Sequence, residues 1–163
     1  MVRWLDEQEQ QTWSAYIRLR QRLDAAMAAG LARDGLSVSD YEILVALSDA
    51  REGSVRARDL AAQICWDKSR LSKHLARMDK RGLVVRSPAA DDARGRLICL
   101  TDSGRRALEQ AAPRHVDLVR RLFVDQLTDA EARAVRSLAD KVSARAERES
   151  DMPPAIGDVA HAD

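Results

Sequence analysis

Three neighbouring stretches decide the expected fold: VRARDLAAQI at 55–64, KSRLSKHLARMDKRGLV at 68–84 and DDARGRLICLT at 91–101. They predict a short helix, a turn, a longer basic helix and a basic β-hairpin. This order is typical of a helix-turn-helix followed by a wing. One helix of such a unit can enter a DNA major groove while the tip of the hairpin reaches the neighbouring minor groove.

Positive charge is concentrated in the same region. Residues 55–101 hold 11 lysines and arginines against 5 aspartates, a net charge of +6, whereas the rest of the chain sums to −5 and the whole chain to +1. Binding to a phosphate backbone needs such an asymmetry, so double-stranded DNA is the expected partner. The alternative is that these charges only solvate helix surfaces, and the adjoining hairpin sequence favours DNA binding.

Composition excludes several other classes. The 163 residues are 45% hydrophobic, enough for one domain with a sizeable core, and the abundance of Ala and Leu favours helices. No apolar run approaches a membrane span, and the polar N-terminal residues do not resemble a signal peptide, so a cytoplasmic protein with no membrane partner is expected. The three histidines and two cysteines lack metal-ligand spacing, and no phosphate-binding glycine loop occurs. We therefore expect no metal, no cofactor and no enzymatic activity.

Hydrophobic periodicity and capping residues place the other elements. Helices are expected at about 6–29, from Ser37 onward, at 57–64, 68–81, 101–126 and 128–147, with strands at 83–86 and 96–100. Residues 51–54 and 88–95 are expected as loops, and a kink is expected at Pro113. The predicted fold class is mostly α with a small β-hairpin (α+β), a winged helix-turn-helix with flanking dimerisation helices. Within one domain at 1–150, the DNA-binding lobe spans about 37–101, the dimerisation helices span 6–30 and 101–148, and 151–163 form a flexible tail.

The ordered set of motifs resembles the MarR family of bacterial transcriptional regulators over about residues 6–148. Three motifs carry the resemblance: SDYEILVAL at 39–47, the basic helix and strand at 68–84, and the wing signature in which Asp92 and Arg94 precede Leu100 and Thr101. It implies a winged-helix homodimer on a pseudo-palindromic operator, with two recognition helices in successive major grooves about 34–36 Å apart. It also implies that Arg94 enters the minor groove and that Asp92 orients it through an ion pair.

The candidate DNA-binding residues are polar or basic and lie in this region: Arg56, Arg58, Ser69, Arg70, Ser72, Lys73, Arg77, Asp92, Arg94 and Arg96. Arg and Lys can bind guanine O6 and N7, and hydroxyl groups can meet bases or phosphates. Arg56 and Arg58, near the shorter helix, are expected to contact phosphates.

The resemblance further implies a cleft for a small aromatic or phenolic effector. Trp13, Tyr16, Arg20 and Tyr41 are the candidates to line it, with Arg20 as counter-ion. The alternative places the aromatic side chains in the core and Arg20 on the surface.

The expected function is a sequence-specific transcriptional regulator, a homodimeric repressor relieved by an effector. One alternative is a weakly specific architectural DNA-binding protein. Another is a redox-sensing regulator that uses Cys65 or Cys99, although core packing is the expected role of both thiols.

Overall fold

The structure is a computed structural model that describes residues 2–50, 53–89 and 92–150, with the backbone alone for 89, 92–95 and 150. It divides into two compact units, residues 1–120 and residues 121–163. The first unit contains α1 (Glu7–Ala32), α2 (Val38–Ser48), β1 (Ser54–Arg56), α3 (Ala57–Gln63), α4 (Lys68–Lys80), β2 (Val84–Ala89), β3 (Asp92–Leu100) and most of α5 (Asp102–Leu122). The second contains the end of α5, a 3₁₀ turn (Val124–Gln126) and α6 (Asp129–Ser150).

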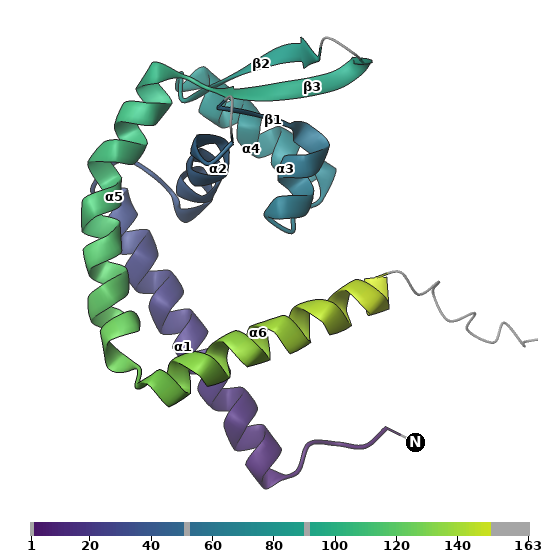
Figure 1. The fold of residues 1–163 in the computed structure, drawn as a ribbon, viewed down its shortest axis with the longest axis vertical. Helices are drawn as coiled ribbons and strands as arrows, with labels where there is room; N and C mark the ends of the chain where they lie inside the picture. The colour runs from purple at the N-terminus through teal and green to yellow at the C-terminus, as the bar shows by residue number, and fades with distance from the viewer. Residues whose placement is uncertain (1, 51–52, 90–91, 151–163) are drawn as a thin grey trace, which may run out of the picture. The chain divides into compact units, whose positions relative to one another are not determined.

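The first unit is a winged helix-turn-helix, which confirms the predicted fold class. Its antiparallel sheet has the strand order β1-β3-β2, and Figure 1 shows α2, α3 and α4 on one side of it. The sheet has three strands rather than the predicted two, because residues 54–56 pair with β3, with Val55 opposite Ile98. A strand of three residues is too short to show alternation in the sequence.

The wing is longer than the sequence predicted. Pro88 and Ala89 belong to β2, and a register shift lies between them, so much of the expected loop at 88–95 is strand. Proline is tolerated there because β2 is an edge strand, where a missing N–H costs no internal ladder bond.

The core of the lobe is built from leucine, isoleucine and methionine side chains of α2, α3, α4 and the sheet. Ile43, Leu44, Leu47, Leu60 and Met78 are completely buried. Gly104, at the start of α5, packs so closely on the backbone of Leu83 that an added Cβ would collide with the Leu83 carbonyl oxygen. This contact attaches α5 to the base of the wing.

Capping residues begin the helices where the sequence predicted. Ser37 Oγ accepts from the Asp40 amide at 3.0 Å, and Asp67 Oδ1 accepts from the Arg70 amide at 2.8 Å. Thr101 and Thr128 cap α5 and α6 in the same way, through the amides of Gly104 and Glu131. Gly82, just beyond α4, has φ of 69°, as expected of a residue that ends a helix in the left-handed region.

Three helices end three or more residues away from their predicted ends. α1 continues through Gly30 to Ala32, and α6 continues to Ser150. α5 ends at Leu122 instead of Gln126, because Phe123 leaves helical geometry at φ −133° and the chain then makes a separate 3₁₀ turn. Pro113 lies inside α5, where the expected kink stays a prediction. The predicted tail at 151–163 lies outside the described residues.

Candidate nucleic-acid interface

α4 has two chemically distinct faces. Leu71, Leu75 and Met78 are buried against the core, together with His74. The side of α4 away from these residues, which we call the outer face of α4, is exposed and consists of Ser69, Arg70, Ser72, Lys73 and Arg77. The 13-residue helix thus presents three cationic side chains and two hydroxyl groups to solvent, a set able to contact phosphates and base edges.

Arg70 is held in place by an aromatic ring from the preceding turn. Its guanidinium carbon lies 3.9 Å from the centroid of the Trp66 ring, a cation–π contact. The Trp66 ring in turn meets His74 edge-on, with 5.4 Å between centroids. The turn between α3 and α4 therefore restrains a cation at the start of the outer face.

A buried carboxylate joins α2 to the far end of α4. Asp40 is 3% exposed, and its Oδ2 lies 2.7 Å from Arg81 Nη1, while its Oδ1 lies 2.8 Å from His74 Nε2. Burial raises the pKa of Asp40, but hydrogen bonds from the Ser37 backbone, Arg81, the Ser37 hydroxyl and His74 together outweigh it and leave that pKa below its usual value. Asp40 is thus ionised and fixes the orientation of α4.

The other candidate DNA-binding residues lie on β1, α3 and β3. Arg58 and Arg96 are exposed, and Arg58 Nε lies 3.1 Å from Asp59 Oδ1, whereas Arg56 is half-buried on β1. The backbones of Asp92 and Arg94 belong to β3, but their side chains, and the ion pair expected between them, lie outside the described residues.

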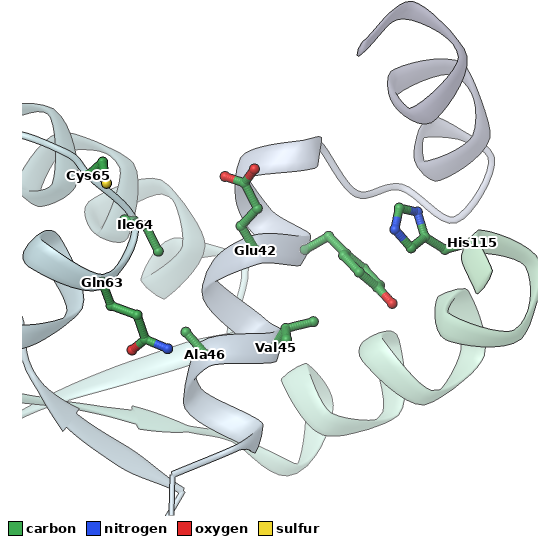
Figure 2. Close-up of a pocket in the computed structure, with 8 residues that line it drawn as sticks. Glu42, Val45, Ala46, Gln63, Ile64, Cys65 and His115 are labelled. Carbon is green, nitrogen blue, oxygen red and sulfur yellow. The ribbon is translucent and has the colours of Figure 1, made fainter. Parts of the chain in front are cut away.

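A surface hollow of about 460 Å³ lies where α2, the end of α3 and α5 meet. Figure 2 shows Gln63, Ile64 and Cys65 on one side of α2 and His115 on the other. Tyr41 also lines it and stacks on His115 at 4.3 Å between ring centroids. Of the four residues expected at an effector cleft, Tyr41 lines this hollow, whereas Trp13, Tyr16 and Arg20 are on α1 and do not.

Comparison with known proteins decides the family. A model of the MarR family matches residues 34–95. The crystal structure of AbsC, a MarR family transcriptional regulator from Streptomyces coelicolor, is 33% identical with a TM-score of 0.87, covering 90% of this chain and 99% of that one. The chain belongs to the MarR family.

Two further similar structures were solved with bound molecules. Sco3205, a MarR family regulator from Streptomyces coelicolor in complex with DNA, is 33% identical over 94% of both chains, with a TM-score of 0.86. CouR from Rhodococcus jostii RHA1, bound to p-coumaroyl-CoA, is 29% identical, covers 77% of this chain and 86% of its own, and has a TM-score of 0.68. As a MarR family member, the present chain is a transcriptional regulator and not an enzyme.

The sequence did not predict the contacts of Asp40 with His74 and Arg81. It also predicted the wrong surroundings for several other side chains. The sequence places Asp40 at capping-box spacing from Ser37, but its other two partners lie 34 and 41 residues away. Cys65 was expected in the core but is exposed, because it occupies a left-handed turn position at φ 54°, while Cys99 is half-buried on the central strand. Trp13 and Tyr16 stack on each other and are exposed, so the alternative that placed them in the core is wrong for this chain.

The described residues contain neither a cluster of side chains that could hold a metal ion nor a helix that could cross a membrane. No group of three or more His, Cys, Asp or Glu side chains there is placed to hold a metal ion. None of the helices in the described residues is both long enough and apolar enough to cross a membrane.

Proposed function

We propose that this MarR family regulator is a homodimeric, sequence-specific repressor that binds a pseudo-palindromic operator through the outer face of α4 and the wing. The observation that carries the proposal is the division of α4 into a buried apolar face and an exposed face with Arg70, Lys73 and Arg77. The likeness to Sco3205, solved with DNA, supports it. Arg56, Arg58 and Arg96 would contact phosphates beside the groove.

The outer face and the wing tip are expected to contribute differently to binding. Arg70→Ala or Lys73→Ala should lose discrimination at particular base pairs, by about 1–3 kcal/mol for each good bidentate contact. Arg94→Ala should weaken binding broadly, and most on duplexes with a narrow A·T-rich minor groove, because its charge responds to the groove potential. Asp92→Ala should partly reproduce that loss.

These variants can be compared by titration at fixed salt against a duplex that the parent protein selects from a random library, and against its single-base variants. Parent-like binding by Arg94→Ala would contradict the proposed contact between the wing and DNA. A parent protein that selects no sequence would indicate a weakly specific architectural DNA-binding protein instead.

The dimer is proposed from apolar side chains that the chain leaves exposed. α1 exposes Trp13, Tyr16 and Leu19, and α5 exposes Val116. In the second unit, α6 exposes Val135, Leu138 and Val142, at 41%, 59% and 58%. Leu108, an apolar residue of α5, is buried in the lobe and is not available for this interface. So many exposed apolar side chains are typical of a surface that a second copy covers.

Sedimentation equilibrium at micromolar concentration should report a dimer for the parent protein. Leu138→Asp should shift the equilibrium toward monomer, because it places a charge in a desolvated contact. Ser137→Asp, at the exposed polar position next to it on the same helix, is the matched control because it adds the same single negative charge. A monomeric parent protein that still binds its selected duplex tightly would contradict the dimer.

The hollow beside Tyr41 is proposed as the effector site. His115 Nδ1 is buried and has no hydrogen-bond partner among the described residues. Burial lowers the pKa of His115 and so favours the neutral ring. A phenol or carboxylic acid in the hollow would pack its ring on Tyr41 and Val45 and, after displacing the side chains that cover this nitrogen, supply the missing partner. The p-coumaroyl-CoA bound to CouR supports an aromatic ligand.

Calorimetric titration with p-coumarate and p-coumaroyl-CoA tests this site. At least one of them should bind and weaken the complex with the selected duplex. His115→Phe should reduce ligand affinity about tenfold, as loss of one hydrogen bond would. Phe123→Leu, outside the hollow, should leave it unchanged. Absence of binding by both ligands, or equal binding by His115→Phe, would overturn the assignment.

A further inference from the structure

The exposed Arg77 side chain is hydrogen-bonded to a buried one, that of His74. Its Nη2 lies 2.8 Å from His74 Nδ1, and His74 is 8% exposed whereas Arg77 is exposed on the outer face of α4. His74 is one helical turn before Arg77, so it can direct the guanidinium without lying on the surface itself.

The two neighbours of His74 determine where its proton lies. The Asp40 carboxylate can only accept a hydrogen bond, so His74 Nε2, at 2.8 Å from Asp40 Oδ1, must donate. The Arg77 guanidinium can only donate, so His74 Nδ1 must accept. Both conditions are met only by the neutral ring with its proton on Nε2, and a proton on Nδ1 would remove the acceptor for Arg77.

The ring has little freedom to turn. Asp40 is fixed by Arg81 Nη1 and by the Ser37 amide, which lies 2.9 Å from Asp40 Oδ2. The Trp66 ring contacts the imidazole edge-on. An arginine side chain loses rotamer entropy when it is immobilised, and a preformed hydrogen bond to a fixed partner reduces the entropy that remains to be lost on binding.

We propose that His74 is a positioning residue that sets the orientation of Arg77 for DNA, so that a buried side chain that does not touch DNA contributes to base discrimination. The proposal rests on the proposed contact of Arg77 with DNA. Its consequence is that the lobe fixes at least one cation of the outer face before DNA arrives.

Two amide substitutions of His74 test the roles of its two ring nitrogens separately. His74→Gln places an amide near the position of Nε2, where it can donate to Asp40 but offers no acceptor to Arg77. His74→Asn places its amide oxygen near the position of Nδ1, where it can accept from Arg77 but does not reach Asp40. Each variant is titrated against the selected duplex and its single-base variants, alongside Arg77→Ala and the double variant His74→Gln/Arg77→Ala. All titrations are done at a temperature below the unfolding midpoint of every variant.

His74→Gln should bind the selected duplex about tenfold more weakly and lose discrimination at the same base pairs as Arg77→Ala. The double variant should bind no more weakly than Arg77→Ala alone, because both changes remove the same oriented Arg77 contact. His74→Asn should retain the parent's discrimination even where it lowers thermal stability, which a merely structural role would not predict.

Nitrogen-15 NMR of the His74 imidazole in the parent protein measures its tautomer directly, without a substitution at His74. The ring should show the neutral Nε2–H tautomer, and Arg77→Ala should move the Nδ1 resonance. Parent-like discrimination by His74→Gln, additive losses in the double variant, or an unmoved Nδ1 resonance would each overturn the role of His74. Parent-like binding by Arg77→Ala would instead remove the proposed DNA contact on which it rests.

Discussion

Replacing Asp40 with alanine is expected to lower the free energy of unfolding by about 3 kcal/mol. Removing one partner of a buried ion pair typically costs about 3–5 kcal/mol, because the other charge is left without compensation. The Arg81 side chain is 43% exposed and can be partly rehydrated, which places the effect at the lower end of that range. Loss of the capping box at the start of α2 is included in the same change.

Urea denaturation of Asp40→Ala beside Glu42→Ala measures this effect. Glu42 is an exposed carboxylate on the same helix, so its removal should change the free energy of unfolding by less than about 0.5 kcal/mol. Equal unfolding curves for the two variants would contradict the anchoring role of Asp40.

The same carboxylate has a predictable pH dependence. Because the pKa of Asp40 is lowered in the folded chain, its contribution is fully present above the unfolded value of about 3.9 and is lost as the pH falls through the folded value. In Asp40→Asn the decline of stability on the acid side should therefore be shallower than in the parent protein. A steeper decline would mean that the pKa is raised rather than lowered.

The sequence was sufficient to predict the elements that depend on local rules. Capping residues such as Ser37 and Asp67 begin helices where neighbouring amides need acceptors. Leu71, Leu75 and Met78, spaced three or four residues apart in the sequence, lie on the buried side of α4. These features depend on residues within about one helical turn of each other, so their signal survives in the order of the amino acids.

Features that depend on distant partners could not be predicted in this way. β1 exists only because β3 supplies its hydrogen bonds, and Asp40 meets His74 and Arg81 only after α2 and α4 have packed. The proposed effector hollow combines Tyr41 with His115 from α5, whereas the sequence paired Tyr41 with α1 residues. In each case tertiary contact, rather than local periodicity, decides the neighbours.

We propose that the basic region at 55–101 is the DNA-binding surface of a dimer. Its exposed cations include Arg58, Lys68, Arg70, Lys73, Arg77, Lys80 and Arg96. Each phosphate neutralised releases counterions and contributes about −0.9 to the slope of log affinity against log salt. A dimer with three such contacts per protomer or more should show a slope on the order of −6 or steeper.

The most direct test is the affinity for the selected duplex, measured by fluorescence anisotropy over a series of potassium chloride concentrations. We predict the steep slope, made shallower by about 2 in Arg58→Gln because one phosphate contact is lost from each protomer, and unchanged in Lys141→Gln on α6. A slope near zero, or equal slopes for the parent and both variants, would contradict the assignment of the basic region as the DNA-binding surface.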